Sequence, residues 1–449
     1  MSIPKSILTA VAATLWAGAV AAQVSPDELK LLGTRLTEFG AEKAGNADGS
    51  IPAYTGGLMT IPAEFKPGSG LYPDPFKDEK PLFAIDPKNM GQYDQFLTPA
   101  SKALLERFPT YKMNVYKTHR TMGYPDWVLK NTVKNASTAR LIEGGDGIDG
   151  AYGGIPFPIP KDGYQVLWNS FMRYQGPRMD IKFQTNLIDR SGRKTLVGYQ
   201  HTSYMYTYYD QKASKLPDWN YVNVFTTTLG PPAQAGTMFM QKHPLDYRTQ
   251  SSATWIYSVG QRRVRIAPEA KYDTPAATVG GAYFFEEIGG YNGRMDRFDY
   301  KLLGKQELFV PYNSYKAMYS PDLAGEQHEN PDAMRYEKHR VWVVEGTLKP
   351  DKRHAYSKRR FYIDEDTWQI LQAEAYDQGG KMYRVVNGMS FMVYDKPRIS
   401  AFGAIYYDLN KGSFAHFTLG GPGLGYFPFD EVPSQSRFTP ETMSDKGVR

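Results

Sequence analysis

Runs of β-forming residues alternate with short polar turns over most of the chain beyond Gly154. Between Lys358 and Arg384, three such runs are separated by turns at 364–367 and 377–380. Asp, Gly, Asn and Pro between runs of β-branched and aromatic residues are typical of hairpins. The pattern therefore predicts a β-meander at 358–384.

The same alternation continues through the C-terminal two thirds, and few segments with helical periodicity interrupt it. Some runs, such as 203–209, are apolar or aromatic on both faces, which indicates a strand that is covered on both sides. We therefore predict an α+β fold, mainly antiparallel β, in which helices cover a large curved sheet or open half-barrel. Besides the meander, the expected strands are 182–189, 195–209, 220–228, 237–243, 253–259, 263–266, 296–303 and 340–348.

Helical periodicity is confined to the N-terminal third. Residues 25–28 combine an N-cap serine, a proline and a capping-box glutamate, and apolar residues three or four apart continue to Phe39, with Gly40 placed to end the helix. Shorter helices are predicted at 98–109 and from Asp126 towards Ile142. Beyond Gly154, the pattern predicts strands alone.

The first residues have the features of an export signal. Lys5 precedes an uncharged apolar run from Ile7 to Val20, and small residues follow. The run is shorter than the roughly 20 residues of a membrane-spanning helix. We predict a signal peptide at 1–22, N-terminal helices and an irregular wrap at 23–150, and the sheet at 151–449. Residues 23–449 are expected to form one cooperative domain without an integral membrane segment.

Composition removes several classes of function. The chain has no cysteine, which excludes a lipid anchor on cysteine, disulfides, thiolate metal sites and thiol nucleophiles. Its 53 Lys and Arg residues nearly balance 47 Asp and Glu residues, so the net charge gives no indication of nucleic-acid binding. The fold must be held together by its core.

Candidates for metal binding or catalysis are weak. The glycine-rich stretch 144–149 is half of a calcium-binding repeat in a single copy, and His339 and His354 have no evident carboxylate partners in the sequence. We therefore predict no metal, no cofactor and no catalytic residue. Acidic pairs at 286–287 and 364–366 keep a hydrolase open as an alternative, because the sequence does not fix the separation of two carboxylates.

Aromatic residues are abundant, with 33 Tyr, 23 Phe and 7 Trp. In the stretch 255–265, Trp255 and Tyr257 lie on a strand that turns at Gly260 and returns with Arg263 and Arg265. Inward aromatic rings with arginines at the rim suit an amphiphile with an anionic head, and an ordinary core with a charged exterior is the alternative. Trp255 and Tyr257 are predicted to form a cavity wall, and Arg263 and Arg265 its rim.

Longer stretches resemble a known family across nearly the whole mature chain. These are GAEKAGNADGSIPAYTGG at 40–57, DPF to EKPLF at 74–83, GIPFPIP at 154–160, RRVR at 262–265 and YIDEDTW at 362–368. They look like domain-of-unknown-function family 1329. The resemblance implies a periplasmic protein of Gram-negative bacteria whose fold is similar to the lipoprotein localisation factors A and B, with an incomplete barrel around an apolar cavity. Members accompany exporters of the resistance-nodulation-division class, and no catalytic residues are carried over.

Together these features predict a periplasmic carrier or chaperone, not an enzyme. It is expected to bind a lipid or other hydrophobic molecule in the half-barrel and to work with a resistance-nodulation-division-type exporter towards the outer membrane. The alternatives are a periplasmic hydrolase with paired carboxylates and an exporter accessory protein that binds no ligand. The acidic triplet 364–366 is interpreted as a turn that fixes strand register.

Overall fold

One sheet of 16 strands dominates the structure, a computed structural model that describes residues 24–58, 60–216 and 218–447. Its strands are β1 (Phe83–Ile85), β2 (Met113–Val115), β5 (Arg178–Ile188), β6 (Lys194–Met205), β7 (Asn220–Gly230), β8 (Met238–Pro244), β9 (Ala253–Ser258), β10 (Arg263–Ile266), β11 (Phe298–Pro311), β12 (Tyr336–Leu348), β13 (Lys358–Asp364), β14 (Ile370–Tyr376), β15 (Met382–Val393), β16 (Arg398–Asp408), β17 (Ser413–Thr418) and β18 (Gly425–Phe429). A separate hairpin joins β3 (Arg140–Leu141) and β4 (Ile148–Asp149).

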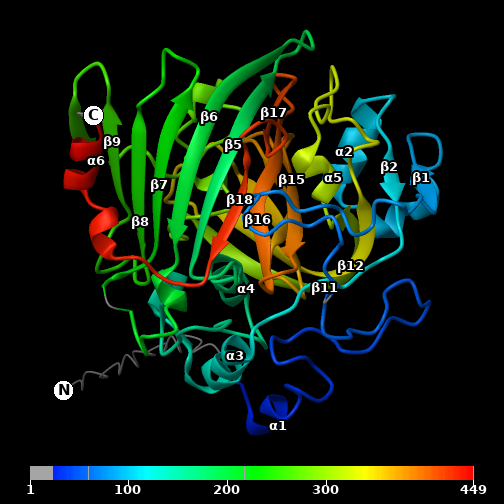
Figure 1. The fold of residues 1–449 in the computed structure, drawn as a ribbon. Coiled ribbons are helices and arrows are strands. Elements are labelled where there is room, and N and C mark those ends of the chain that lie inside the picture. Colours follow the sequence, from blue (N-terminus) through cyan, green and yellow to red (C-terminus); the bar gives the residue numbers. More distant parts are fainter. Residues whose placement is uncertain (1–23, 59, 217, 448–449) are drawn as a thin grey trace, which may run out of the picture.

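The strand order runs from β1 at one edge through β2, β12, β13, β14, β15, β16, β17, β5, β6, β7, β8 and β9 to β10, with β11 paired to β12 and β18 to β5. The pairings are antiparallel apart from a single parallel pair between β12 and β2. The two ends of this order do not pair with each other among the described strands, so the sheet is open (Figure 1). The predicted mainly antiparallel, open architecture is confirmed.

The helices are short and lie around the sheet. They are α1 (Pro26–Leu29), α2 (Pro99–Arg107), α3 (Asp126–Thr138), α4 (Gly163–Phe171), α5 (Tyr315–Tyr319) and α6 (Pro440–Gly447), with 3-10 turns η1 (Met90–Phe96), η2 (Glu143–Gly145), η3 (Thr207–Tyr209), η4 (Ala277–Val279), η5 (Phe285–Glu287) and η6 (Gln435–Arg437). In Figure 1, α6 lies beside β9, at the opposite end of the sheet from β1 and β2. Within the described residues, no helix has the length and apolarity needed to cross a membrane. The predicted signal peptide at 1–22 lies outside the described residues.

The predicted meander is confirmed as β13, β14 and β15, with its first turn at 365–369. This turn is fully buried, unlike an ordinary hairpin turn. Arg120 donates two hydrogen bonds to the Asp366 carboxylate, at 2.8 and 2.6 Å, and Tyr124 donates its hydroxyl to the Asp366 carbonyl oxygen at 2.7 Å. The N-terminal wrap therefore closes over the turn and neutralises part of its charge.

The helix predicted from Pro26 to Phe39 is wrong. The capping box at Ser25 forms, but α1 ends at Leu29 and the chain turns repeatedly as far as Phe39. Gly33 adopts a left-handed φ of 77°, which an α-helix does not allow. Leu36 and Phe39 are nevertheless buried, so their side chains pack into the core from successive turns of the chain and not from one face of a helix.

Helix α4 contradicts the expectation that strands alone follow Gly154. Tyr164, Leu167, Trp168 and Phe171 do recur at helical spacing, but the helix is only nine residues long and nearly all of it is buried, its polar residues included. One local signal was present: the Asp162 side chain accepts the Gln165 backbone N–H at 2.9 Å as an N-cap. Helix α4 contacts β11 and β12 of the sheet, and a short connection at 172–177 leads from it to β5.

His339 and His354 do have carboxylate partners, contrary to the sequence interpretation. His339 Nε2 lies 3.1 Å from Glu337 Oε2, and His354 Nε2 lies 3.0 Å from Glu286 Oε1. Both pairs are buried: Glu337 lies two residues from His339 on β12, whereas Glu286 and His354 are far apart in the sequence and only the fold brings them together. Each histidine therefore belongs to a buried ion-pair network.

Buried Glu329 makes stability depend on pH. Its Oε1 accepts from Tyr111 and Asn387, while Oε2 has no partner, and burial raises the pKa of this carboxyl from 4.5 to about 7. Between these two values the native state holds more protons than the unfolded state, so the free energy of unfolding falls as pH rises. This contribution is fully lost above the folded pKa.

We expect Glu329→Gln to stabilise the protein at about pH 8 by on the order of 3 kcal/mol and to change little at about pH 4. Urea unfolding at both pH values measures this difference. Glu326→Gln, at an exposed neighbouring position, is the matched control and should show no such pH dependence. Equal effects of the two substitutions would contradict the assignment.

Candidate ligand-binding cavity

The open end of the sheet presents one continuous inner face. Because antiparallel partners point to the same side, Thr202 of β6, Thr226 of β7, Phe239 of β8, Ile256 of β9 and Arg265 of β10 form one row across five strands. All five line a cavity of about 490 Å³. The register of these strands thus builds the cavity wall.

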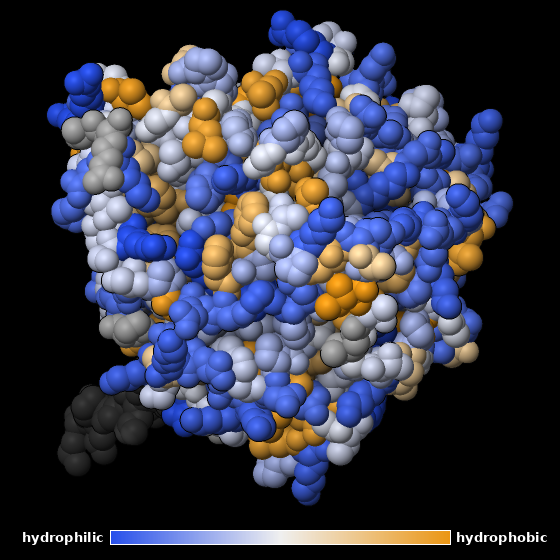
Figure 2. Space-filling model, in the orientation of Figure 1, coloured by the Kyte–Doolittle hydropathy of each residue, from blue (hydrophilic) through white to orange (hydrophobic). Residues whose placement is uncertain are grey.

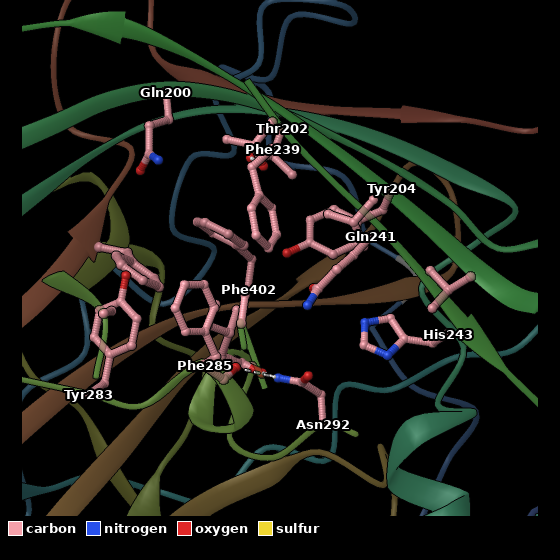
Figure 3. A pocket seen from close by; sticks show the side chains of 18 of the residues that line it. Gln200, Thr202, Tyr204, Phe239, Gln241, His243, Tyr283, Phe285, Asn292 and Phe402 are labelled. Atoms are coloured by element: carbon pink, nitrogen blue, oxygen red, sulfur yellow. Dashed lines mark hydrogen bonds between the residues drawn. The ribbon is translucent and has the colours of Figure 1, made fainter. Parts of the chain in front are cut away.

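The connection between β10 and β11 covers this face. Residues 269–292, which include η4 and η5, fold back over the strands and contribute Tyr283, Phe285 and Asn292 to the lining. Figure 3 shows Tyr283 and Phe285 across the cavity from Thr202 and Phe239. Phe402 and Phe417, from β16 and β17, belong to the same lining. A long loop therefore covers this face of the cavity.

The lining is mostly apolar and aromatic, with a few polar side chains. Tyr204 extends from β6, and Gln241 and His243 extend from β8, towards the interior (Figure 3). Burial lowers the pKa of His243 to about 4, so its imidazole is neutral at neutral pH. Burial raises the pKa of Tyr204 to about 12, so its hydroxyl remains a hydrogen-bond donor. An apolar site with a few placed polar groups is the usual composition of a small-molecule pocket.

Two of the four predicted site residues face away from this cavity. Trp255 and Tyr257 alternate with Ile256 on β9 and pack on the other side of the sheet against a cluster that contains Phe438 and Met443. The Tyr257 hydroxyl donates to the Gly447 carbonyl oxygen of α6 at 2.9 Å. The C-terminal helix therefore covers the aromatic face that the sequence assigned to the wall.

The two predicted rim arginines also separate. Arg265 lines the cavity, where its Nη1 lies 2.8 Å from Glu269 Oε1. Arg263 is exposed and is not part of the lining. A ligand-binding role for any of the four residues stays a prediction.

The remaining lining residues were not singled out from the sequence. Those on β6 to β8, such as Tyr204 and Gln241, lie in strands that were predicted, and their alternation could have identified them as one face. The loop residues Tyr283, Phe285 and Asn292 carry no comparable signal, because their position depends on how 269–292 folds back.

Carboxylates do not converge in this cavity. Among the described residues that line it, Glu269 is the single acidic side chain, and it pairs with Arg265. Glu286 instead pairs with Arg359, and Glu287 accepts the Tyr356 hydroxyl at 2.5 Å, both within the buried protein interior. The paired-carboxylate hydrolase therefore finds no support in the cavity geometry.

One group of described residues has metal-ligand geometry: ligand atoms of His339, Asp364 and Asp366 all lie within 4.8 Å of one another. Burial and the nearby Asp366 raise the pKa of Asp364 to about 6. Arg120 already binds both oxygens of Asp366, so a cation here would face a guanidinium at close range. The interpretation of this triplet as a structural turn stays a prediction.

A second cavity of about 1020 Å³ lies between the wrap at 71–81, α5 and residues 332–335. Several of its charged side chains pair with each other: Lys112 with Asp332 at 2.8 Å and Arg335 with Glu79 at 2.7 Å. Figure 2 shows that the outer face in this view is largely hydrophilic, with small separate hydrophobic groups. Because several charged side chains line the second cavity, the mostly apolar cavity under β5 to β10 is the better candidate for an apolar ligand.

The fold and this cavity define an open, mainly antiparallel β protein with an apolar cavity between its sheet and a covering loop. Residues 84–444 match the family described as protein of unknown function (DUF1329), and the chain belongs to that family. It is 39% identical over 446 residues to an uncharacterized protein of Pseudomonas aeruginosa, covering 98% of this chain and 97% of the relative.

Several solved structures match more distantly. An outer-membrane lipoprotein-sorting protein domain of Vibrio parahaemolyticus is 12% identical, with a TM-score of 0.43, covering 62% of this chain and 97% of that one. A DUF1329 protein of Desulfovibrio piger is 14% identical, with a TM-score of 0.43, covering 63% and 97%. A LolA superfamily protein of Nitrosomonas europaea is 12% identical, with a TM-score of 0.35, covering 60% and 93%. Family membership rests on the sequence matches.

Proposed function

We propose that this protein is a periplasmic carrier that shields a lipid or similarly hydrophobic molecule in the cavity under β5 to β10. The observation that carries the proposal is the lining itself: aromatic and aliphatic side chains from β6 to β9, β16 and β17 enclose about 490 Å³. This volume is within the range of small-molecule pockets. Burying acyl chains yields about 0.8 kcal/mol per methylene, so such a cavity can hold a lipid without any reactive group.

Transfer towards the outer membrane, together with a resistance-nodulation-division-type exporter, completes the proposal. This part rests on the family resemblance, and its test is co-purification with an exporter encoded beside the gene. The absence of a carboxylate pair from the described lining favours carriage over hydrolysis.

Binding of a neutral apolar probe tests the carrier function. We expect Nile red to bind the purified protein with the blue-shifted fluorescence of an apolar site, and long-chain lipids to displace it. Bovine serum albumin serves as a positive control for the probe, and a urea-unfolded sample of this protein as a negative control. Absence of binding by the folded protein, with and without prior removal of bound lipid, would contradict the proposal.

A further inference from the structure

Arg173 is a buried cation without an acidic partner. It lies just beyond the C-cap of α4, is 8% exposed and lines the cavity. No described carboxylate lies within ion-pair distance of its guanidinium. Elsewhere in the described interior, buried arginines such as Arg120, Arg359 and Arg384 all have carboxylate partners. Arg173 is therefore the exception.

Hydrogen bonding does not compensate for this isolation. A guanidinium carries five N–H donors and stays charged at all physiological pH values. One Nη1 donor reaches the Ser170 carbonyl oxygen, and Nε is buried without a partner. Burying a charged group without a counter-ion is costly, so such a group is commonly retained for function.

The surroundings of Arg173 suit an anion. Tyr204, Tyr206 and Tyr221 line the same cavity as Arg173. Tyr206 accepts a hydrogen bond from Gln175 at 2.7 Å, which leaves its hydroxyl proton free to donate. Tyr204 points into the cavity (Figure 3). One guanidinium and two phenols thus offer several donors at one place in an apolar cavity.

On these grounds, and resting on the proposed carrier function, we propose that the cavity selects anionic amphiphiles and that Arg173 binds the anionic headgroup inside the cavity. The oxygens of a carboxylate or phosphate would accept hydrogen bonds from the free N–H groups of the guanidinium, and the anion would supply the missing ion-pair partner. The apolar chain would then lie along Phe239, Phe285 and Phe402. Arg265 also lines the cavity, but Glu269 already pairs with it at 2.8 Å, so Arg173 is the lining cation with an unmet need for an anion.

Displacement of Nile red by matched probes tests this inference. Dodecanoate and dodecanol share one chain and differ in headgroup charge, and inorganic phosphate supplies an anion without a chain. We expect wild-type protein to bind dodecanoate roughly ten- to a hundredfold more tightly than dodecanol. Phosphate alone should not displace the probe, since the chain supplies most of the affinity.

Arg173→Met should abolish the preference for dodecanoate while retaining Nile red and dodecanol binding. Its melting temperature without ligand should equal or exceed that of wild type, because an unpaired buried charge is removed. Arg193→Met, at an exposed arginine paired with Asp189, is the matched control and should keep the preference. If Arg173→Met does not fold, the wild-type affinities for dodecanoate and dodecanol still test the headgroup assignment. Arg173→Lys keeps the charge and should keep the preference for dodecanoate.

The outcomes separate this inference from the carrier proposal. Equal affinity of wild type for dodecanoate and dodecanol overturns the headgroup assignment and leaves the carrier intact. A preference that survives in Arg173→Met also overturns it, and displacement of Nile red by phosphate alone overturns the selection of amphiphiles over free anions. Failure of wild type to bind Nile red and both amphiphiles contradicts the carrier function itself.

Discussion

Arg120→Met is expected to destabilise the protein by about 3 to 5 kcal/mol, the usual cost of removing one partner from a buried ion pair. The Arg120 side chain is 3% exposed, and its guanidinium binds both oxygens of Asp366 and the Glu42 carbonyl oxygen. Methionine fills a similar volume but leaves the Asp366 carboxylate buried without its cation. The turn between β13 and β14 would also lose one of its links to the N-terminal wrap, while the hydrogen bond from Tyr124 would remain.

Urea unfolding measures this loss, and Arg35→Met is the matched control. Arg35 pairs with Glu42 at 3.5 Å, but its side chain is 71% exposed, so its removal should cost less than about 1 kcal/mol. In a double-mutant cycle, Asp366→Asn should recover part of the Arg120→Met loss. A loss in Arg120→Met no larger than that of the control would show that the buried pair does not hold this turn.

Thr226→Trp is expected to reduce Nile red and dodecanoate binding at least about tenfold, because an indole added to the central cross-strand row fills much of the cavity. Thr226 lies between Thr202 and Phe239 in that row, and its Oγ1 is 2.8 Å from Thr202 Oγ1. Since the new side chain enters existing space, the fold should tolerate it better than overpacking of a filled core.

Thr227→Trp is the matched control for this substitution. Thr227 is the next residue on β7, so its side chain points to the other face of the sheet. The same bulk is added to the same strand, and binding should remain at the wild-type level. If both tryptophan variants bind like wild type, or both lose binding equally, the cavity is not the site.

The architecture could be predicted because its signals are local. Each strand of the meander is bounded by turn residues, and the period of two gives the pairing, so β13 and β14 lie close to their predicted bounds, whereas β15 continues beyond the predicted end at Arg384 to Val393. Helix α4 is harder to predict because it is only nine residues long and lies between strands, although its apolar residues recur at helical spacing. The helix predicted up to Phe39 failed because Gly33 adopts a left-handed conformation.

The site was harder to predict because β9 is apolar on both faces. The large aromatic residues Trp255 and Tyr257 appeared to be the better cavity wall, yet α6 covers them and Ile256 faces the cavity. Only the position of the C-terminal helix decides between the two faces. Arg173 gives no sequence signal, because only the fold shows that it is buried and that no described carboxylate pairs with it.

Mass spectrometry of the protein purified from the periplasm under native conditions tests the central claim most directly. Wild type, Thr226→Trp and Thr227→Trp are prepared in parallel, and the molecules released by solvent extraction are quantified per protein chain. We predict that wild type and Thr227→Trp carry the same hydrophobic molecule and that Thr226→Trp has lost it. Wild type that arrives empty and stays empty after incubation with periplasmic lipids, or Thr226→Trp that carries the wild-type amount, would contradict the account.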